Sequence, residues 1–160
     1  MSNQYQDFKD RTKDNTETHD RAKRFFEIKK ISYCEYGIQQ VKVFGNDGTF
    51  GLPKQVLKAP DFITLTKDRE AFIEVKGCSR FLNLKVNDIK YYHFWNSAFN
   101  MKLWILAIEY SNNDVYTIPL DDLTEILIHQ KLEPKPYEND GKLRYEIDLR
   151  DLEMYKQVIT

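Results

Sequence analysis

The chain has 160 residues, a length typical of one domain with its own hydrophobic core. Apolar residues make up 41% and aromatic residues 14% of it, which excludes an intrinsically disordered chain. The net charge is −1, so composition alone does not indicate a nucleic-acid-binding protein. Residues 1–120 carry 18 basic and 15 acidic side chains, whereas residues 121–160 carry 6 and 10. This asymmetry predicts that any polyanion contacts the first three-quarters of the chain.

The cysteines and the apolar runs indicate where the protein resides. Cys34 and Cys78 are far apart in the sequence, which argues against a disulfide framework, a zinc site or a redox pair and favours a reducing compartment. The longest apolar run, from Leu103 to Ile108, is far shorter than the roughly 20 residues of a membrane-spanning helix. Since the N-terminus is polar, we expect a cytoplasmic protein with no export signal or membrane anchor.

The first predicted element is a helix over residues 16–30, which contain no Gly or Pro, with Asn15 or Thr16 as its cap. Residues 1–14 are predicted to form a polar N-terminal arm. The positions with helical spacing are Ala22, Phe25, Phe26 and Lys29.

Strands are predicted next. Residues 32–44 are rich in β-favouring side chains and predict one or two strands, and the glycine-rich residues 45–51 predict a turn ahead of Pro53. Two short strands follow at 61–66 and 71–76, joined by the polar turn KDRE.

A second helix is predicted over residues 86–99, and the nearly continuous apolar run at 102–110 predicts a central strand buried on both faces. The predicted apolar stripe of this helix is Tyr91, Phe94, Trp95, Ala98 and Phe99. The order of helix, strands, helix and strand indicates a mixed α/β domain with a core at residues 15–120.

The last 40 residues are predicted to extend the same domain. They contain a helix at 121–131, preceded by a short strand at 115–118, then a break at EPKP and an edge-like strand at 142–149. This segment has three alternative roles: covering the site, docking a partner, or dimerising across the exposed edge of its strand.

The two short strands bring two acids and a lysine together. With residues 67–70 as the turn, Asp61 lies opposite Lys76 and diagonal to Glu74, and all three side chains project from one face. The two carboxylates are then roughly 7–8 Å apart or less, a spacing at which they can share one Mg²⁺. The carbonyl oxygen of Val75 and water would complete the coordination.

Two interpretations of this hairpin compete. An ordinary hairpin can present a Glu-x-Lys strand as a solvated outer face. In a metal-dependent phosphodiesterase, the Lys76 ammonium would orient or partly deprotonate the attacking water and offset charge on the scissile phosphate. Ile73 and Val75 on the opposite face indicate a strand with a buried side, and together with the downstream helix and strand they favour the phosphodiesterase.

The pattern PD…EVK resembles the core motif of the PD-(D/E)XK phosphodiesterase superfamily, which has the restriction-endonuclease-like fold. The order of ETHDRAKRFFEIKKISYCEY, PDFITL and FIEVKG is similar to that in phage junction-resolving endonucleases. The resemblance covers residues 15–108, and PDF…EVKG is its most specific part. It departs between Tyr36 and Pro60, where this chain has a longer connection.

The resemblance implies a Mg²⁺- or Mn²⁺-dependent DNA endonuclease that acts on branched or structured DNA as a homodimer, in a bacterial or phage-infected cell. It implies that Asp61 and Glu74 are metal ligands and that Lys76 is the catalytic lysine. Glu17 corresponds to the helix carboxylate that completes the site, with Asp20 and Glu27 as alternatives. An acid such as Glu17 in a first turn also simply favours the helix dipole.

Several other residues are candidates for DNA contact. On the second helix, His93 is expected to be a packed or hydrogen-bonded residue, and Tyr92 to belong to the core, although Tyr92 could stack on a base. The candidate phosphate-binding residues are Lys85, Lys90, Arg21, Lys23 and Arg24.

A different class of function keeps the fold and lacks the reaction. The chain would then be a binding module or a subunit of a phage or mobile-element complex, whose carboxylates hold a structural cation or remain from an enzyme. The mild charge and the acidic tail favour this hypothesis, and the intact set of Asp61, Glu74 and Lys76 disfavours it.

Overall fold

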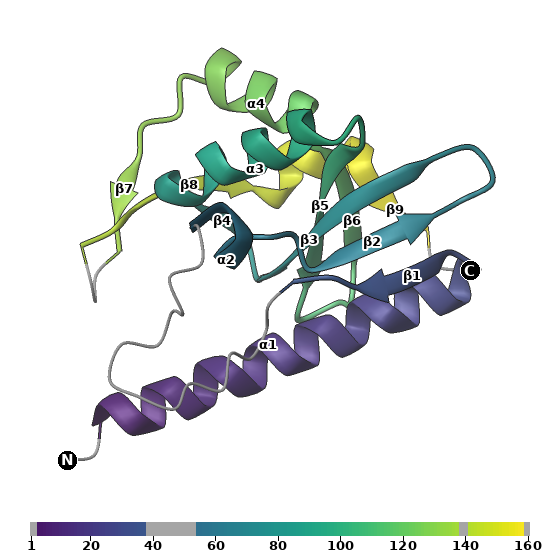
Figure 1. The fold of residues 1–160 in the computed structure, drawn as a ribbon. Coiled ribbons are helices and arrows are strands. Elements are labelled where there is room, and N and C mark those ends of the chain that lie inside the picture. Colours follow the sequence, from purple (N-terminus) through teal and green to yellow (C-terminus); the bar gives the residue numbers. More distant parts are fainter. Residues whose placement is uncertain (1–2, 38–53, 138–140, 159–160) are drawn as a thin grey trace.

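The computed structural model describes residues 3–37, 54–137 and 141–158, with the side chains of the first helix described from Thr16 onward. Figure 1 shows a central sheet with helix α1 on one face and helices α3 and α4 on the other. The predicted mixed α/β domain is therefore confirmed.

The main sheet has six strands in the order β1-β2-β3-β5-β6-β9. The two central strands β3 and β5 are parallel, and the other neighbours are antiparallel. The strands are β1 (Ser32–Glu35), β2 (Phe62–Leu65), β3 (Glu70–Cys78), β5 (Lys102–Glu109), β6 (Val115–Pro119) and β9 (Lys156–Gln157).

Strand β5 is buried on both faces, as predicted. Leu103, Ile105 and Ala107 pack in the core beneath α3 and α4. Leu106 and Ile108 point the other way and pack against α1. This alternation explains why the strand appears in the sequence as a continuous apolar run.

The register of the β2–β3 hairpin differs from the predicted one by two residues. Its ladder begins with Phe62 opposite Ile73 and leaves residues 66–69 as the turn. A shift of two keeps every side chain on its predicted face, because side chains alternate with a period of two. Continued by one residue, the observed register places Asp61 opposite Glu74, so the predicted diagonal arrangement is wrong.

Helix α1 (Asn3–Ile28) begins much earlier than predicted. The predicted cap at Asn15 or Thr16 is wrong because both residues lie inside the helix, and most of the predicted arm belongs to it. Residues 3–15 contain no Gly or Pro that would end a helix. The predicted apolar stripe is confirmed at Ala22 and at two phenylalanines, Phe25 and Phe26, which pack against the sheet.

The opposite face of the sheet is covered by α3 (Val86–Ala98), α4 (Leu120–His129) and the 3₁₀ helix η1 (Leu149–Tyr155). The buried residues of α3 are Tyr92 and Trp95. Phe94 and Phe99, which were predicted for its apolar stripe, are exposed. Aromatic residues occur around much of this helix, so their spacing alone did not identify the side that faces the sheet.

A second, smaller sheet has the order β4-β8-β7. Its strands are β4 (Phe81–Lys85), β7 (Lys135–Pro136) and β8 (Leu143–Asp148). The prediction that residues 142–149 form an edge strand is wrong, because β8 lies between β4 and β7, although β7 pairs only with Leu143 and Arg144. Since β4 comes from the predicted core at residues 15–120, the last 40 residues complete the same domain.

Between β1 and β2 the structure shows a short helix, α2 (Lys54–Leu57), which was not predicted. Of the strand segment predicted at 32–44, residues 32–35 form β1, and the rest beyond residue 37 lies outside the described residues. The predicted turn at 45–51 and Pro53 also lie outside them. None of the described helices is long and apolar enough to cross a membrane.

Candidate active site

Asp61 sits immediately before β2 and reaches across to β3. Its Oδ2 accepts a hydrogen bond from the N–H of Val75, at 2.8 Å. Its main-chain carbonyl accepts one from the N–H of Tyr36, at 2.9 Å. Because β2 pairs with β3 only as far as Ile73, the Asp61 carboxylate accepts the hydrogen bond from Val75 that a residue of β2 would otherwise accept.

The carbonyl oxygen of Val75 lies on the same side of β3 as Asp61. In a β-strand the N–H and C=O groups of one residue point in the same direction. Since the N–H of Val75 points to Asp61, its carbonyl is also directed away from β5 and toward the region that β2 leaves open.

Glu74 and Lys76 form the centre of the cluster. The Nζ of Lys76 donates to the Oε1 of Glu74 at 2.5 Å, and the hydroxyl of Tyr92 donates to the same oxygen at 3.1 Å. Glu74 and Tyr92 are buried, and Lys76 keeps 27% of its side chain exposed. Both described hydrogen bonds of the Glu74 carboxylate are made by Oε1, so Oε2 is available to a ligand.

Burial and charge set the protonation of this pair. Burial raises the pKa of the Glu74 carboxyl, although the neighbouring Lys76 ammonium acts in the opposite direction. Burial alone would lower the pKa of Lys76, but the negative charges of Glu74 and Asp61 outweigh it and hold this pKa well above its ordinary value. Lys76 is therefore a cation at neutral pH.

These oxygen atoms fit a small divalent cation. Mg²⁺ prefers carboxylate and carbonyl oxygen and commonly keeps several waters, so that one or two carboxylates suffice to bind it. Asp61, Glu74 and the Val75 carbonyl supply this donor set. In the ranges that the structure describes, no three His, Cys, Asp or Glu side chains are arranged around one metal position. A cation here would thus depend on the two carboxylates, the main-chain oxygen and water.

His19 is a member of the cluster that the sequence analysis missed. Its Nε2 lies 3.4 Å from the Oδ1 of Asp61. Burial lowers the pKa of His19, but the hydrogen bond to Asp61 and the charge of that carboxylate outweigh burial and raise it. His19 also packs against the ring of Phe62, with ring centroids 5.5 Å apart.

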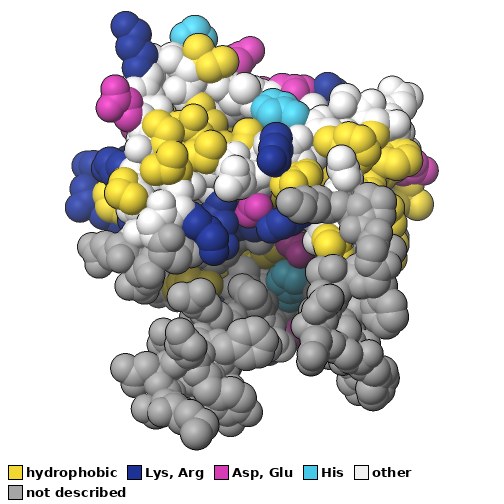
Figure 2. Space-filling view, turned by 60° about the vertical axis from the view of Figure 1, so that its left-hand side comes forward, with side chains coloured by type: hydrophobic (Ala, Val, Ile, Leu, Met, Phe, Trp, Pro, Cys, Tyr) yellow, Lys and Arg dark blue, Asp and Glu magenta, His cyan; other side chains and the backbone are white. Residues whose placement is uncertain are grey.

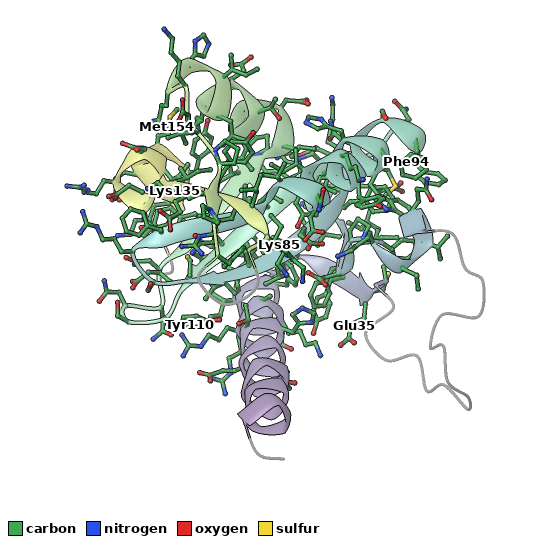
Figure 3. The ribbon with its side chains drawn as sticks, turned by 90° about the vertical axis from the view of Figure 1, so that its left-hand side faces the viewer. Glu35, Lys85, Phe94, Tyr110, Lys135 and Met154 are labelled. Carbon is green, nitrogen blue, oxygen red and sulfur yellow. The ribbon has the colours of Figure 1, made fainter. Side chains whose placement is uncertain are left out.

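The rotation of α1 explains why His19, and not Glu17, reaches Asp61. Thr18 is buried against the sheet, and successive helix residues are about 100° apart, so Glu17 and His19 flank the buried stripe on opposite sides. Glu17 pairs with Arg21 at 2.6 Å, and Arg21 also donates a hydrogen bond to the main-chain carbonyl of Tyr110. Figure 3 shows Tyr110 on one side of α1 and Glu35 on the other.

None of the three predicted helix acids has a described contact with Asp61 or Glu74. Glu17 is engaged by Arg21, Asp20 lies 3.9 Å from the ammonium of Lys23, and Glu27 accepts a hydrogen bond from Tyr33 at 3.4 Å. The buried stripe of Thr18, Ala22 and Phe25 was the sequence signal that would have oriented the helix.

Gly77 follows the lysine because α1 and Tyr110 leave no room for a side chain. A Cβ atom at Gly77 would lie 1.7 Å from the Oη of Tyr110 and 2.9 Å from the Oγ1 of Thr18. Those two oxygens are hydrogen-bonded to each other at 2.9 Å. Gly77 thus permits the contact that fixes α1 next to Lys76.

We expect Gly77→Ala to lower the free energy of unfolding by about 1 kcal/mol, because Tyr110 must swing out and release its hydrogen bond to Thr18. Urea denaturation measures this change. In a Tyr110→Ala background the same substitution should cost much less, since the clashing ring is absent. Equal costs in both backgrounds would show that Tyr110 does not impose the glycine.

The predicted DNA-contacting residues differ in whether an acid of the protein already binds them and in how exposed they are. Arg21 and Lys23 are paired with Glu17 and with Glu35, respectively. The other three, Lys85, Lys90 and Arg24, are exposed. Lys85 occupies the N-cap position of α3 but makes no side-chain capping hydrogen bond, and Lys90 lies 5.0 Å from the ring centroid of Tyr91.

Tyr92 and His93, the two other candidates on α3, both make hydrogen bonds within the protein. Tyr92 is a buried hydrogen-bond donor to Glu74, as expected for a core residue, so it is not placed to stack on a base. The Nε2 of His93 lies 3.4 Å from the hydroxyl of Thr124 on α4, which confirms the hydrogen-bonded alternative.

Figure 2 shows acidic, basic and histidine side chains gathered around a hollow in the middle of one face of the molecule.

Comparisons with known proteins agree with this fold. No family model and no curated protein matches the chain. The Holliday junction resolvase Hjc of the archaeal hyperthermophile Archaeoglobus fulgidus is similar in structure over 86% of this chain and 88% of that chain, with a TM-score of 0.52 and 13% identity. D212, a nuclease from a fusellovirus, is similar over 88% and 86%, with a TM-score of 0.45 and 9% identity. At such identities the likeness to the resolvase shows the fold alone, a mixed β-sheet flanked by helices.

Proposed function

We propose that the protein is a Mg²⁺- or Mn²⁺-dependent DNA endonuclease of the PD-(D/E)XK type, which hydrolyses phosphodiester bonds in branched or structured DNA. The observation that carries the proposal is the cluster of Asp61, Glu74 and Lys76 at the end of β3 that β2 leaves unpaired. The cluster lies in a fold shared with a Holliday junction resolvase. We further propose a homodimer in the cytosol of a bacterial or phage-infected cell, since cutting two strands suits two symmetric sites.

In this proposal Asp61, Glu74 and the Val75 carbonyl hold the cation. The bound Mg²⁺ supplies a Lewis acid for a phosphate oxygen and an activated water. Asp61 is kept in place by the N–H of Val75, and Glu74 by Tyr92 and Lys76, so the chain orients both carboxylates before any ligand arrives. Such preorganisation avoids the cost of ordering these groups during the reaction.

Lys76 acts as a cation and a hydrogen-bond donor. The carboxylates around it hold its pKa well above the ordinary value, so the side chain is an ammonium at neutral pH. Its ammonium would bind the scissile phosphate and offset the negative charge that builds on it. The exposed quarter of its side chain is the part that such a phosphate can reach.

Tyr92 positions Glu74. We expect Tyr92→Phe to raise the Mg²⁺ concentration needed for half-maximal cleavage about tenfold. Loss of a hydrogen bond behind a metal ligand commonly costs 10–100-fold in affinity or activity. Mg²⁺ titrations of the cleavage rate and of the melting midpoint measure the change. Tyr91→Phe, one residue away on the same helix, is the matched control. If both variants titrate like the wild type, Tyr92 has no positioning role.

The proposed activity is tested with end-labelled linear duplex, single-stranded, flap and four-way DNA, incubated with Mg²⁺, with Mn²⁺ or with EDTA. We expect metal-dependent cleavage and a preference for the branched substrates. Absence of cleavage on every substrate with both metals would contradict the proposal.

The binding-module hypothesis is favoured by one observation, the direct engagement of Glu74 by Lys76 at 2.5 Å. In that case the buried ion pair stabilises the sheet and the protein binds DNA without cutting it. Binding of four-way DNA with no cleavage in either metal is its expected result.

A further inference from the structure

The small sheet has an apolar inner face and a charged outer face. Leu82, Leu84 and Ile147 point into the core. Because side chains alternate along a strand, the intervening residues of β4 and β8 point outward, as do the residues of β7 that pair with them.

Three cations form a row across this outer face. Lys85 on β4 pairs with Arg144 on β8, and Arg144 pairs with Lys135 on β7. Like charges directly opposite each other destabilise a sheet. Glu146 offsets part of this repulsion, because its carboxylate binds Arg144 at 2.5 Å and Lys135 at 2.9 Å.

A second group of charges continues this face along β4 and β8. Asp148 lies opposite Phe81 and therefore points outward. Its carboxylate is shared by Arg80, at 3.4 Å, and Arg150, at 2.8 Å. Each acid on the face is thus held between two cations.

We call this surface the cationic face. Its cations are Arg80, Lys85, Lys135, Arg144 and Arg150, and its acids are Glu146 and Asp148. Five cations thus stand against two acids among these residues, and Lys156, Glu109 and Asp114 line the same hollow as Arg80 and Arg150. Three of the cations come from the last 40 residues, which are acidic as a whole. The prediction that any polyanion contacts the first three-quarters of the chain rested on summed charge and took no account of this arrangement.

The cationic face begins next to the candidate active site. Strand β4 follows β3 after the two residues Ser79 and Arg80, and Lys85 directly precedes the helix that carries Tyr92. Figure 3 shows Lys85 and Lys135 on the same side of the molecule, and Figure 2 shows dark blue side chains from the centre of a face toward its left edge.

The aromatic rings on this surface are covered by cations. The guanidinium of Arg144 lies 4.2 Å from the ring centroid of Tyr137, and that of Arg80 lies 5.0 Å from that of Phe81. Surfaces that bind single strands use open aromatic rings on which bases stack. These rings instead support flat guanidinium groups, which suit phosphate oxygens.

We propose that the cationic face binds the sugar-phosphate backbone of a duplex arm of DNA that leaves the active site. Adjacent strands are about 4.8 Å apart, so the row from Lys85 to Lys135 spans about 10 Å, close to the roughly 12 Å width of the major groove. This inference rests on the proposed function and specifies its substrate: the DNA is double-stranded on the side of the small sheet.

The test is binding of a long duplex and of four-way DNA without metal, measured over a series of salt concentrations. We expect the double variant Lys85→Gln, Lys135→Gln to bind about tenfold more weakly at 0.1 M salt. The slope of log K against log[salt] should fall by about 2, since each lost phosphate contact removes about 0.9. The charge-preserving variant Lys135→Arg should retain wild-type binding.

Lys102→Gln is the matched control. Lys102 is 65% exposed and bound to Asp121 at 2.8 Å, and Lys135 is 66% exposed and bound to Glu146 at 2.9 Å, so both substitutions remove an exposed lysine that is paired with one acid. Lys102 lies at the start of β5, outside the cationic face. Melting curves of all variants exclude unfolding as the cause of weaker binding.

The outcomes separate the inference from the proposed function. If the wild type cuts DNA and the double variant binds duplex as tightly as the wild type and with the same salt slope, the inference that the cationic face binds DNA is wrong and the proposed nuclease function is retained. If the double variant loses duplex binding while the wild type cuts no DNA, duplex binding by the cationic face is supported and the proposed nuclease function is rejected. Competition by single-stranded DNA or polyglutamate as strong as that by duplex would overturn the assignment to a duplex arm, and no DNA binding at all would overturn both.

Discussion

Lys76→Met is expected to lower the rate of DNA cleavage by at least about 100-fold, the usual cost of removing one group that stabilises transition-state charge. Methionine keeps the length and the apolar part of the side chain but cannot carry the charge. The rate constant under single-turnover conditions at saturating Mg²⁺ measures this effect. Lys67→Met in the exposed hairpin turn is the control and should leave the rate unchanged.

The same variant is expected to lose stability in a pH-dependent manner. Without Lys76, burial and the charge of Asp61 raise the pKa of Glu74 further. A carboxyl whose pKa is raised in the folded state binds its proton more tightly there than in the unfolded chain, so stability falls as pH rises through the interval between the two values. We expect a loss of about 3 kcal/mol at pH 8, the lower end for breaking a buried ion pair, and a smaller loss at pH 5.

Urea denaturation at both pH values gives this comparison. If Lys76→Met is as stable as the wild type at pH 8 and also cuts DNA at the wild-type rate, the lysine belongs to an ordinary charged hairpin. Lost activity with unchanged stability would mean that the ion pair with Glu74 does not form in solution, while the proposed role at the phosphate remains.

Local patterns predicted the parts of the site that depend on alternation within one strand. Glu74 and Lys76 share a face because they are two residues apart, and this holds in any register. The register itself depends on the turn, where both the N–H and the hydroxyl of Thr66 bond to the carbonyl of Arg69. Such a side-chain contribution to a turn does not follow from residue preferences, so Asp61 was placed diagonal to Glu74 instead of opposite it.

Contacts between distant segments were not predictable from local patterns. His19 meets Asp61 only because Thr18 and its stripe orient α1 on the sheet, and a pattern of helix acids does not identify a histidine. Likewise β8 was predicted as an edge strand because its partner β4, which lies between β3 and α3 in a segment without a turn signal, was not predicted. The cationic face depends on that pairing and was missed for the same reason.

Asp61→Asn separates metal binding from folding and is expected to have the largest effect on function. Asparagine keeps an oxygen that accepts the hydrogen bond from the N–H of Val75, so the end of β2 should stay in place. The negative charge is lost, and a single carboxylate, Glu74, remains for the cation. We expect cleavage to fall about 1000-fold or more, since binding and orienting the cation both suffer.

The melting midpoint provides a readout that does not depend on cleavage. A ligand that binds only the native state raises the midpoint, so the wild type should be stabilised by millimolar Mg²⁺ or Mn²⁺ and Asp61→Asn should not be. Asp68→Asn in the hairpin turn removes an exposed acid and should respond like the wild type. An Asp61→Asn protein that is still stabilised by metal would exclude Asp61 as a ligand. A wild type that is stabilised through Asp61 and yet cuts no DNA would favour the binding module with a structural cation, because the metal site would then exist without the reaction.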